Sequence, residues 1–272
     1  MGDRLTIMEK PEASRAAAAV MSIASSLGLA AEDVVILNNS NKLTLRLLPC
    51  DVVARVAPLG YQLGQFEIPI AERLASQGSP VARLDPRIAP AIHSRDGFAA
   101  TFWTYYEPAS SNSIPPADYA DALQRLHTGM RAVDLGTPHF TDRIGSAQRL
   151  LADRDQTPAL GEVDRALLVD TLQTLAPAIG ERGSCEQLLH GEAHSGNVLA
   201  TTQGLVFIDF ETCCRGPVEF DLAHAPEKVS EHYPQVDHGL LRDCRTLALA
   251  LMTTWRWDRD DQLPNGPQLG LR

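Results

Sequence analysis

The first part of the chain has the hydrophobic pattern of one helix followed by short strands. The segment PEASRAAAAVMSIASSLGL, with Pro11 near its start and Gly28 near its end, predicts an opening helix. Three short β-rich runs follow it, at residues 34–37, 43–48 and 52–56. Because the connections NNSNK and PCD are both rich in turn residues, we expect these runs to form an antiparallel meander.

A second helix and a hairpin complete this first part. The segment QFEIPIAERLASQG predicts a helix that ends at Gly78, although Pro69 limits how early its regular part begins. Residues 92–94 and 98–105 flank the turn RDG and predict a hairpin. The segment EPASSNSIPP, residues 107–116, then has the proline and serine content of a linker.

The remaining sequence has mostly helical spacing. ADYADALQRLHTGMRAV predicts a helix because its apolar residues form one stripe, at Tyr119, Ala122, Leu123, Leu126 and Met130. EVDRALLVDTLQTLAPAIG repeats that spacing, and we expect a further helix within residues 233–257. Between these helices, GLVFIDF and the polar segment before it predict a short β-hairpin. The pattern predicts an α+β fold with a β-rich lobe (1–106), a hinge (107–116) and a helical lobe (117–272).

Composition and charge exclude several classes of function. The net charge is −10, and no run of Lys and Arg resembles a nucleic-acid footprint, so we expect no nucleic-acid partner. No apolar run is long enough to span a bilayer, and the first residues lack the apolar core of a signal peptide. Five cysteines without metal-finger spacing fit reduced thiols, and we expect the adjacent Cys213 and Cys214 to be buried. These features predict a cytoplasmic protein with no membrane partner.

Polar residues gather in LLHGEAHSGNVLA, residues 188–200, and in VFIDFETCC, residues 206–214. Asn197 and Asp209 lie across the predicted hairpin, with Asp209 on its return strand, and can converge on one hard cation. Mg²⁺ prefers such oxygen ligands and keeps positions for water and substrate phosphates. Glu192, in the same loop, can accept a hydrogen bond from an attacking hydroxyl. Charge neutralisation and an oriented nucleophile are what phosphoryl transfer requires.

Two other chemistries fit this segment less well. His190 and His194 flank Glu192, but zinc proteases carry H-E-x-x-H on a helix, and the glycine in HGEAH discourages a helix. Ser195 lacks the G-x-S-x-G turn of a hydrolase nucleophile. Zinc and serine hydrolase chemistry are therefore disfavoured.

Four ordered elements resemble the aminoglycoside phosphotransferase family, whose kinase-like enzymes are related to choline kinases. HGEAHSGN and IDFE resemble H-G-D-x-H-x-x-N and I-D-[FW]-[ED], ALQRLHT resembles the leucine-leucine-histidine helix, and RGPVEFDLAH resembles the G-[DP]-x-x-x-D-L-A segment. NNSNKLTLRL is similar to the turn that covers the nucleotide phosphates, and FEIPIAERLASQGSPVARL to the helix whose glutamate pairs with a phosphate-binding lysine. The resemblance spans most of the chain. It implies a protein-kinase-like two-lobed fold, with ATP and Mg²⁺ as cofactors.

The resemblance also implies roles for residues of the polar segments. Asn197 and Asp209 would hold Mg²⁺, and Glu192 stands at the position of the catalytic aspartate. His190 would brace the loop, and Asp221 would accept hydrogen bonds from it.

On the nucleotide side, the resemblance implies contacts from the small lobe and the hinge. The backbone of FWTYYE would meet adenine, Arg55 stands at the position of the phosphate-binding lysine, and Glu67 would be its partner. The residues expected to bind the cofactor are Ser40, Asn41, Arg55, Glu67, Trp103 and Tyr105. Arg55 and Glu67 have a simpler interpretation as ordinary exposed residues of a strand and a helix.

Two departures from the family pattern leave two functions open. Glu192 is one methylene longer than aspartate, and a displacement of about one ångström can lower a rate roughly a hundredfold. Arg55 keeps the positive charge but is not equivalent to lysine at a tight site. The chain is then either a working O-phosphotransferase or a pseudokinase, a regulatory or scaffold module that binds nucleotide without transferring phosphate. Because Asn197 and Asp209 both persist, we favour the active enzyme.

The expected substrate carries both a hydroxyl and an amine group, as in aminoglycoside or peptide antibiotics and choline-like metabolites. This class follows from the resemblance and includes antibiotic resistance among the possible roles; the negative net charge adds only weak support for a cationic substrate. The tail TTWRWDRDD offers aromatic faces and negative charge, which suit an amine, but it also fits a packed helix end. Candidate substrate residues are Glu211, Trp255, Trp257 and Asp258.

Overall fold

The N-terminal lobe is built on a five-stranded antiparallel sheet with the order β1-β2-β3-β5-β4. The structure is a computed structural model and describes residues 7–61, 63, 66–110, 113–182 and 185–263. The strands are β1 (Ala31–Asn39), β2 (Leu43–Pro49), β3 (Val52–Pro58), β4 (His93–Arg95) and β5 (Phe98–Thr104). The predicted meander and hairpin are therefore confirmed, and β1 is longer than its hydrophobic run. Asp96 and Gly97 form the hairpin turn at φ 50° and 85°.

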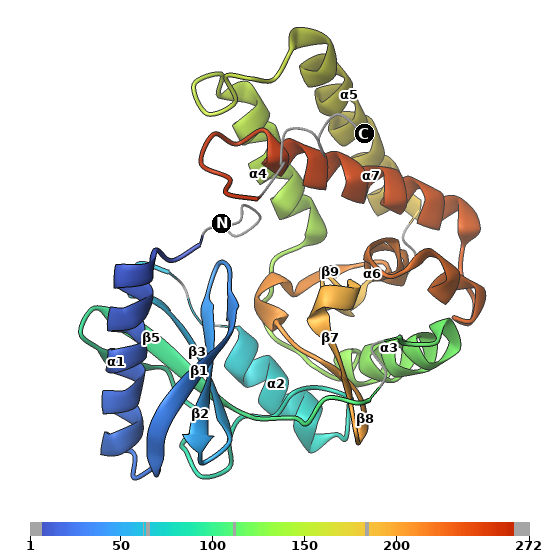
Figure 1. Cartoon of the computed structure of the whole chain (residues 1–272). Coiled ribbons are helices and arrows are strands. Elements are labelled where there is room, and N and C mark those ends of the chain that lie inside the picture. The colour runs from blue at the N-terminus through green and yellow to red at the C-terminus, as the bar shows by residue number, and fades with distance from the viewer. Residues whose placement is uncertain (1–6, 62, 64–65, 111–112, 183–184, 264–272) are drawn as a thin grey trace.

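Side-chain alternation gives this sheet two different faces. On one face, α1 (Lys10–Ser26), the predicted opening helix, packs against fully buried side chains of β2 and β3: Leu43, Leu45, Leu47, Val52, Ala54 and Val56. On the other face, Val53 and Trp103 pack with residues of α2 (Glu67–Ser76) and β8 (Gly204–Phe207). The two helices therefore cover opposite sides of the sheet (Figure 1). Arg55 alternates with the buried residues of β3 and belongs to the second face.

The helix α2 connects the two lobes. It spans the predicted segment, with Pro69 in its first turn, where a missing N–H breaks no helical hydrogen bond, and with Gly78 at φ 75° after its end. Ile70 and Leu74 are fully buried in the same core cluster as Leu123 and Leu126 of α3 (Pro116–Met130). A core shared by both lobes fixes α2, and with it Glu67, against the C-terminal lobe.

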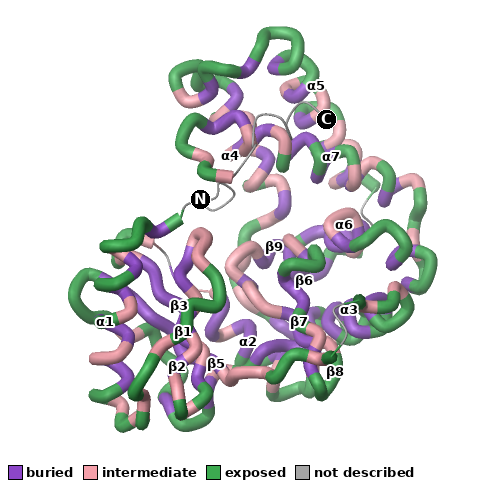
Figure 2. Tube along the Cα trace, viewed as in Figure 1, coloured by how far each residue is buried: buried purple, intermediate pink, exposed green. Residues whose placement is uncertain are grey.

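Helices make up most of the C-terminal lobe. The predicted apolar stripe of α3 is buried at all five positions, which confirms that helix. The two other predicted helices are α5 (Glu162–Arg182) and α7 (His238–Arg256), whereas α4 (Phe140–Ala152) and α6 (Val218–His224) are not predicted by the hydrophobic analysis above. Helices α4, α5 and α7 bury a second core at the top of the view in Figure 1, and Figure 2 shows the exposed outer turns of this layer. None of the described helices is long and apolar enough to cross a membrane.

Two short strand pairs carry the polar segments. The strand β6 (Gln187–Leu189) pairs with β9 (Cys214–Gly216), and β7 (Val198–Thr201) pairs with β8. The predicted hairpin is thus β7–β8, but the expectation that Asp209 lies on its return strand is wrong. Strand β8 ends at Phe207, and Asp209 follows it at φ 70°, just before the 3₁₀ turn η2 (Phe210–Thr212).

The hinge runs from β5 towards α3 and touches the C-terminal lobe. The Ala109 N–H donates to the Ala200 carbonyl at 2.9 Å, and Pro108 bridges to Thr201 of β7. Ser111 and Asn112 of the predicted hinge lie outside the described residues. The hinge therefore reaches the strand that begins directly after Asn197.

Candidate active site

The loop of residues 190–197, here the polar loop, is fixed by a buried carboxylate. Asp221, on α6, is fully buried and accepts hydrogen bonds from the His190 N–H at 2.8 Å and the Gly191 N–H at 2.7 Å. His127 of α3 contacts the same carboxylate at 2.9 Å through Nε2. Burial by itself would raise the pKa of Asp221, but the hydrogen bond and charge of His127 outweigh it and hold that pKa below its usual value. The expected hydrogen bonds from the loop to Asp221 are present.

Close packing fixes the first residues of the polar loop. A Cβ on Gly191, which has φ 85°, would lie 2.0 Å from the Thr212 carbonyl oxygen, so the position requires glycine. His190 contacts the Ile208 carbonyl at 2.8 Å through Nε2, and its ring lies 5.0 Å from that of Phe210. His190 thus braces the loop against the segment that carries Asp209, as expected.

The β7–β8 hairpin brings Asn197 and Asp209 to one end. The Ile208 N–H donates to the Asn197 carbonyl at 3.0 Å, so the residues that precede β7 and follow β8 lie side by side. Asn197 Nδ2 donates to the Glu192 carbonyl at 3.0 Å, which leaves Oδ1 as the acceptor of its side chain. An amide oxygen and a carboxylate fit Mg²⁺, which takes few protein ligands when phosphates supply the rest. Within the described residues, no group of three or more His, Cys, Asp or Glu side chains is placed to hold a metal.

Two cations reach Asp209 from the N-terminal lobe. Lys42 Nζ lies 2.8 Å and Arg55 Nη2 lies 2.9 Å from the same oxygen, Oδ1. Arg55 also forms an ion pair with Glu67, which is fully buried and accepts a further hydrogen bond from the Phe210 N–H at 3.3 Å. The predicted contact between Arg55 and Glu67 is therefore present. Their simpler interpretation as exposed residues is wrong, because the Arg55 side chain is only 11% exposed.

Lys42 was not predicted as a site residue. It is 5% exposed, and its Nζ also lies 2.7 Å from Oε2 of Glu211, which accepts a hydrogen bond from the Tyr61 hydroxyl at 3.1 Å. The alternation of β2 could have identified it. Leu43, Leu45 and Leu47 face α1. Lys42, one position before Leu43, is therefore expected on the opposite face of the sheet. Five side chains, here the charged cluster, thus form one connected group: Lys42, Arg55, Glu67, Asp209 and Glu211. Glu211, predicted at the substrate, has its carboxylate in this cluster.

The charged cluster keeps Asp209 ionised. Burial would raise the pKa of Asp209, but the charges of Arg55 and Lys42 outweigh it and hold that pKa well below its usual range. Burial would likewise lower the pKa of Arg55, and the charges of Asp209 and Glu67 instead raise it above its usual value. Asp209 is therefore a carboxylate at every pH at which the protein is expected to work, as a metal ligand must be.

Glu192 is held by a residue from an unpredicted helix. Arg143, in the first turn of α4, donates from Nη2 to Glu192 Oε1 at 2.6 Å and from Nη1 to the Gly191 carbonyl at 3.0 Å. The Glu192 backbone lies beside Asn197, as expected. Whether its carboxylate reaches a transferred phosphoryl group stays a prediction. No sequence signal links Arg143 to Glu192, which lies 49 residues further along the chain.

The remaining nucleotide candidates lie around the sheet and the hinge. Ser40 and Asn41 form the turn between β1 and β2, directly before Lys42. Trp103 is 4% exposed in the cluster with Val53 and Ile208, and the Tyr105 ring lies 3.7 Å beneath the Arg46 guanidinium. Their roles at the nucleotide stay predictions.

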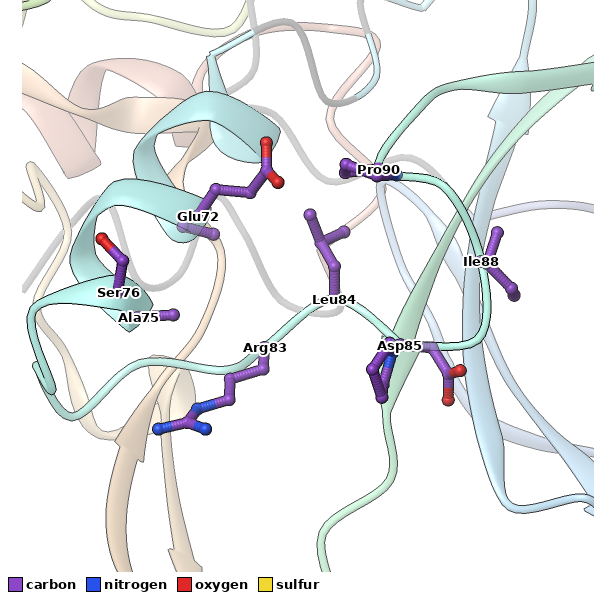
Figure 3. Close-up of a pocket in the computed structure, with 10 residues that line it drawn as sticks. Glu72, Ala75, Ser76, Arg83, Leu84, Asp85, Ile88 and Pro90 are labelled. Atoms are coloured by element: carbon purple, nitrogen blue, oxygen red, sulfur yellow. The ribbon is translucent and has the colours of Figure 1, made fainter.

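A cavity of about 380 Å³ lies between the hinge and the polar loop. Tyr106 and Pro108 line it from the hinge, and Ser195, Val198 and Leu199 line it from the loop and β7. A second cavity, of about 400 Å³, lies between α2 and residues 83–90 (Figure 3). Its lining includes no residue of the polar loop or the charged cluster, whereas the lining of the first cavity includes Ser195 of the polar loop. Of these two cavities, the first therefore lies beside the candidate site.

The C-terminal candidates lie at the end of α7. Trp257 is 7% exposed and belongs to the apolar core of α4, α5 and α7, against which Trp255 also packs. Asp258 is 9% exposed. Trp257 therefore belongs to a packed helix end, one of the two interpretations of this segment. Substrate contact by Trp255 and Asp258 stays a prediction.

The adjacent cysteines are buried thiols. Cys213 and Cys214 are buried, as expected, and burial raises the pKa of both thiols, that of Cys214 to about 12. Thiols in this state stay protonated and are poor nucleophiles.

Solved structures show the same architecture. A choline kinase from Streptococcus pneumoniae matches with a TM-score of 0.68 at 17% identity, over 93% of each chain. An aminoglycoside phosphotransferase from Streptomyces rimosus, in complex with ADP and streptomycin, matches with a TM-score of 0.58 at 18% identity, over 77% of this chain and 90% of that one. An amicoumacin kinase in complex with AMP-PNP and Ca²⁺ matches with a TM-score of 0.62 at 10% identity, over 97% and 85%. The fold is therefore kinase-like and two-lobed, as predicted.

Comparison at the level of the sequence identifies the family. No curated protein matches the chain. The family model of the phosphotransferase enzyme family, in contrast, matches residues 31–256, which include the charged cluster, the hinge and the polar loop. The chain therefore belongs to the phosphotransferase enzyme family.

Proposed function

We propose that this enzyme transfers the γ-phosphoryl group of ATP to a hydroxyl group of a small, amine-bearing molecule. The observation that carries the proposal is the meeting of the charged cluster with the polar loop. Lys42 and Arg55 contact Asp209, and the neighbouring Ile208 N–H donates to the carbonyl of Asn197, whose side chain donates to the Glu192 backbone. Phosphoryl transfer needs positioning and charge neutralisation more than covalent chemistry from the protein, and this arrangement supplies both.

The nucleotide would lie between the sheet and the hinge. Arg55 is oriented by Glu67 and can donate to phosphate oxygens in pairs, while the turn of Ser40 and Asn41 would cover the phosphates. Asn197 and Asp209 would hold Mg²⁺, which when bound neutralises charge on the transferred group. The likeness to structures with ADP and with AMP-PNP and Ca²⁺ supports a nucleotide and a divalent cation at this site.

The acceptor would bind beside Glu192. Its carboxylate would accept the proton of the attacking hydroxyl, and Arg143 would hold that carboxylate in position. Such a clamp offers one way for a longer side chain to serve where aspartate is usual, because the ion pair limits the rotation of the added methylene. Choline and streptomycin, the compounds named for similar structures, are cationic, which supports an amine-bearing acceptor.

The alternative is a pseudokinase that binds nucleotide without transferring phosphate. The observation that favours it is the ion pair itself, because a carboxylate engaged by Arg143 is a weaker hydrogen-bond acceptor for a hydroxyl. This alternative shares the nucleotide site with the enzyme and differs from it only on the acceptor side.

The experiment that separates the two combines binding and turnover. Nucleotide affinity is measured with the purified chain, and ATP consumption is followed over a panel of choline, ethanolamine, aminoglycosides and peptide antibiotics with hydroxyl groups. We expect consumption that depends on both Mg²⁺ and one class of acceptor. Nucleotide binding without turnover on any acceptor would support the pseudokinase.

A further inference from the structure

Lys42 occupies an unusual position for a lysine. The chain has three lysines, of which Lys10 and Lys228 are exposed, whereas Lys42 is 5% exposed. Burial of an ammonium group is unfavourable unless it is paired and hydrogen-bonded. Its position at the point where the phosphate-covering turn enters β2 therefore needs an explanation.

The partners of Lys42 place it at the centre of the charged cluster. Its Nζ lies 2.8 Å from Oδ1 of Asp209 and 2.7 Å from Oε2 of Glu211. Arg55 reaches the same Asp209 oxygen at 2.9 Å from the neighbouring strand. Two cations, one from the turn before β2 and one from β3, therefore converge on the carboxylate beside which the phosphates are proposed to lie.

The two cations are held differently. Arg55 is fixed by Glu67, which is fully buried and accepts a further hydrogen bond from the Phe210 N–H in η2. Lys42 carries a compact charge on a flexible stem with three donors. Within the described residues, the carboxylates of Asp209 and Glu211 account for two of them. Lys42 can therefore turn towards a phosphate oxygen while it keeps one carboxylate as a partner.

The net charge of the cluster also favours contact between Lys42 and a phosphate group. Its three carboxylates and two cations carry a formal charge of −1, and Oε1 of Glu211 is buried without a hydrogen-bond partner in the described part of the chain. Removal of Lys42 would leave Arg55 alone against three carboxylates. A triphosphate would then meet a strongly negative site, so its entry depends on Lys42 as well as on Arg55.

We propose that Lys42 is a second phosphate-binding cation, which contacts the terminal phosphates of the nucleotide beside Arg55. This inference rests on the proposed function, because it places a nucleoside triphosphate in that site. It adds a residue that neither the sequence motifs nor the resemblance assigned. A structural ion pair that only holds β2 against η2 is the alternative that the tests must separate.

Affinity labelling of the unaltered chain tests the position of Lys42. In an acyl-phosphate derivative of ATP, the reactive carbonyl sits at the terminal phosphate. The lysine amine attacks this carbonyl, an amide forms, the acyl–phosphate bond breaks, ATP leaves, and the amine proton passes to solvent. Peptide mass spectrometry should find the acyl group on Lys42, with Lys10 and Lys228 as internal controls, and excess ATP should suppress it. Nucleotide binding with no ATP-protected label on Lys42 would overturn the proposal.

Substitution tests the contribution of Lys42 to binding. We expect Lys42→Met to weaken the affinity for ATP roughly ten- to a hundredfold, the range for a lost charge-assisted hydrogen bond, and Lys42→Arg to restore part of it. Lys228→Met, an exposed lysine with the same change, should leave the affinity unchanged. A purely structural pair predicts a lower melting temperature with unchanged ATP affinity, and that result would overturn the proposal.

The two proposals fail in different ways. If the unaltered chain binds ATP through Lys42 but phosphorylates no acceptor, the role of Lys42 stands and the proposed function fails. If the chain phosphorylates an acceptor while Lys42→Met binds ATP as the unaltered chain does, the proposed function stands and the role of Lys42 fails.

Discussion

On the nucleotide side of the site, two cations and three carboxylates form one connected cluster, whereas on the acceptor side a single ion pair holds Glu192. Lys42, directly before β2, and Arg55, on the neighbouring strand β3, share one oxygen of Asp209. Among the described residues, the Glu192 side chain forms an ion pair with Arg143, from the first turn of α4. The nucleotide side thus joins several charges around the sheet, whereas the acceptor side joins a loop to a distant helix.

This difference suits the two kinds of ligand that the proposed function requires. A triphosphate and its metal have a fixed chemistry, which the charged cluster can meet in only a few ways. An acceptor varies in size and charge, and a loop clamped by one arginine can change its partner without disturbing the sheet. Substitutions on the nucleotide side should therefore change nucleotide and Mg²⁺ binding, whereas substitutions on the acceptor side should lower turnover at nearly unchanged ATP affinity.

The largest effect is expected for Asp209→Asn, on the nucleotide side. Loss of this charge leaves Lys42 and Arg55 with one carboxylate fewer and removes the expected metal ligand, so turnover should fall about a thousandfold or more. Nucleotide affinity should also lose its dependence on Mg²⁺, which a titration with Mg²⁺ measures. An unchanged Mg²⁺ dependence would contradict the metal assignment.

Glu192→Gln should give the next largest effect, confined to the acceptor side. The amide cannot take the hydroxyl proton, so turnover should fall about a hundredfold or more, within the usual range for a general base. ATP affinity should change little. Glu192→Asp should also lower activity if the site has adapted to the longer side chain. Phosphorylation by Glu192→Gln at the unaltered rate would exclude Glu192 as the base.

A smaller loss is expected for Arg143→Met, which releases the Glu192 carboxylate. We expect turnover to fall roughly ten- to a hundredfold, because a displaced base lowers the rate without removing it. Arg149→Met is the matched control, because Arg149 is exposed on the same helix and donates to the Ser146 hydroxyl. Equal losses in both variants would show that α4, rather than the ion pair, is responsible.

Asp221→Asn should have its main effect on stability, because Asp221 supports the loop that both sides share. We expect the free energy of unfolding to fall by about 3 kcal/mol near neutral pH, the range for a broken buried network. The pKa of Asp221 is lowered in the folded state, so its contribution is present above the unfolded value of about 3.9 and is lost as the pH falls through the folded value. Acid unfolding should therefore be less steep in the variant. Exposed Asp121 provides a control.

On the nucleotide side, the contact between Arg55 and Glu67 was predicted from the sequence, through the family resemblance. Arg55 and Glu67 lie 12 residues apart, on a strand with clear alternation and on the helix that follows, so their contact could be expected from the sequence. The same alternation indicated the sheet face on which Lys42 lies, but no sequence motif identified Lys42 as a site residue. The conformation of Asp209 could not be predicted, because a positive φ at a non-glycine residue depends on the groups that surround it.

The acceptor side depends on contacts between distant residues, which the sequence does not show. The buried side chains of α4 have helical spacing, at Phe140, Ile144, Ala147 and Leu151, so the helix itself was predictable. Its contact with the polar loop was not, because 49 residues separate Arg143 from Glu192. Burial of Trp257 likewise follows from the packing of α4, α5 and α7 together, not from its own segment.

Transfer of phosphate from this site to an acceptor can be measured directly as a change in the mass of the acceptor. Each compound of the panel is incubated with ATP, Mg²⁺ and either the unaltered chain or the Asp209→Asn variant. The masses of the products are then measured by mass spectrometry. We expect at least one amine-bearing alcohol to gain the mass of one phosphoryl group with the unaltered chain and to gain none with the variant. Nucleotide binding without any phosphorylated acceptor would contradict this expectation.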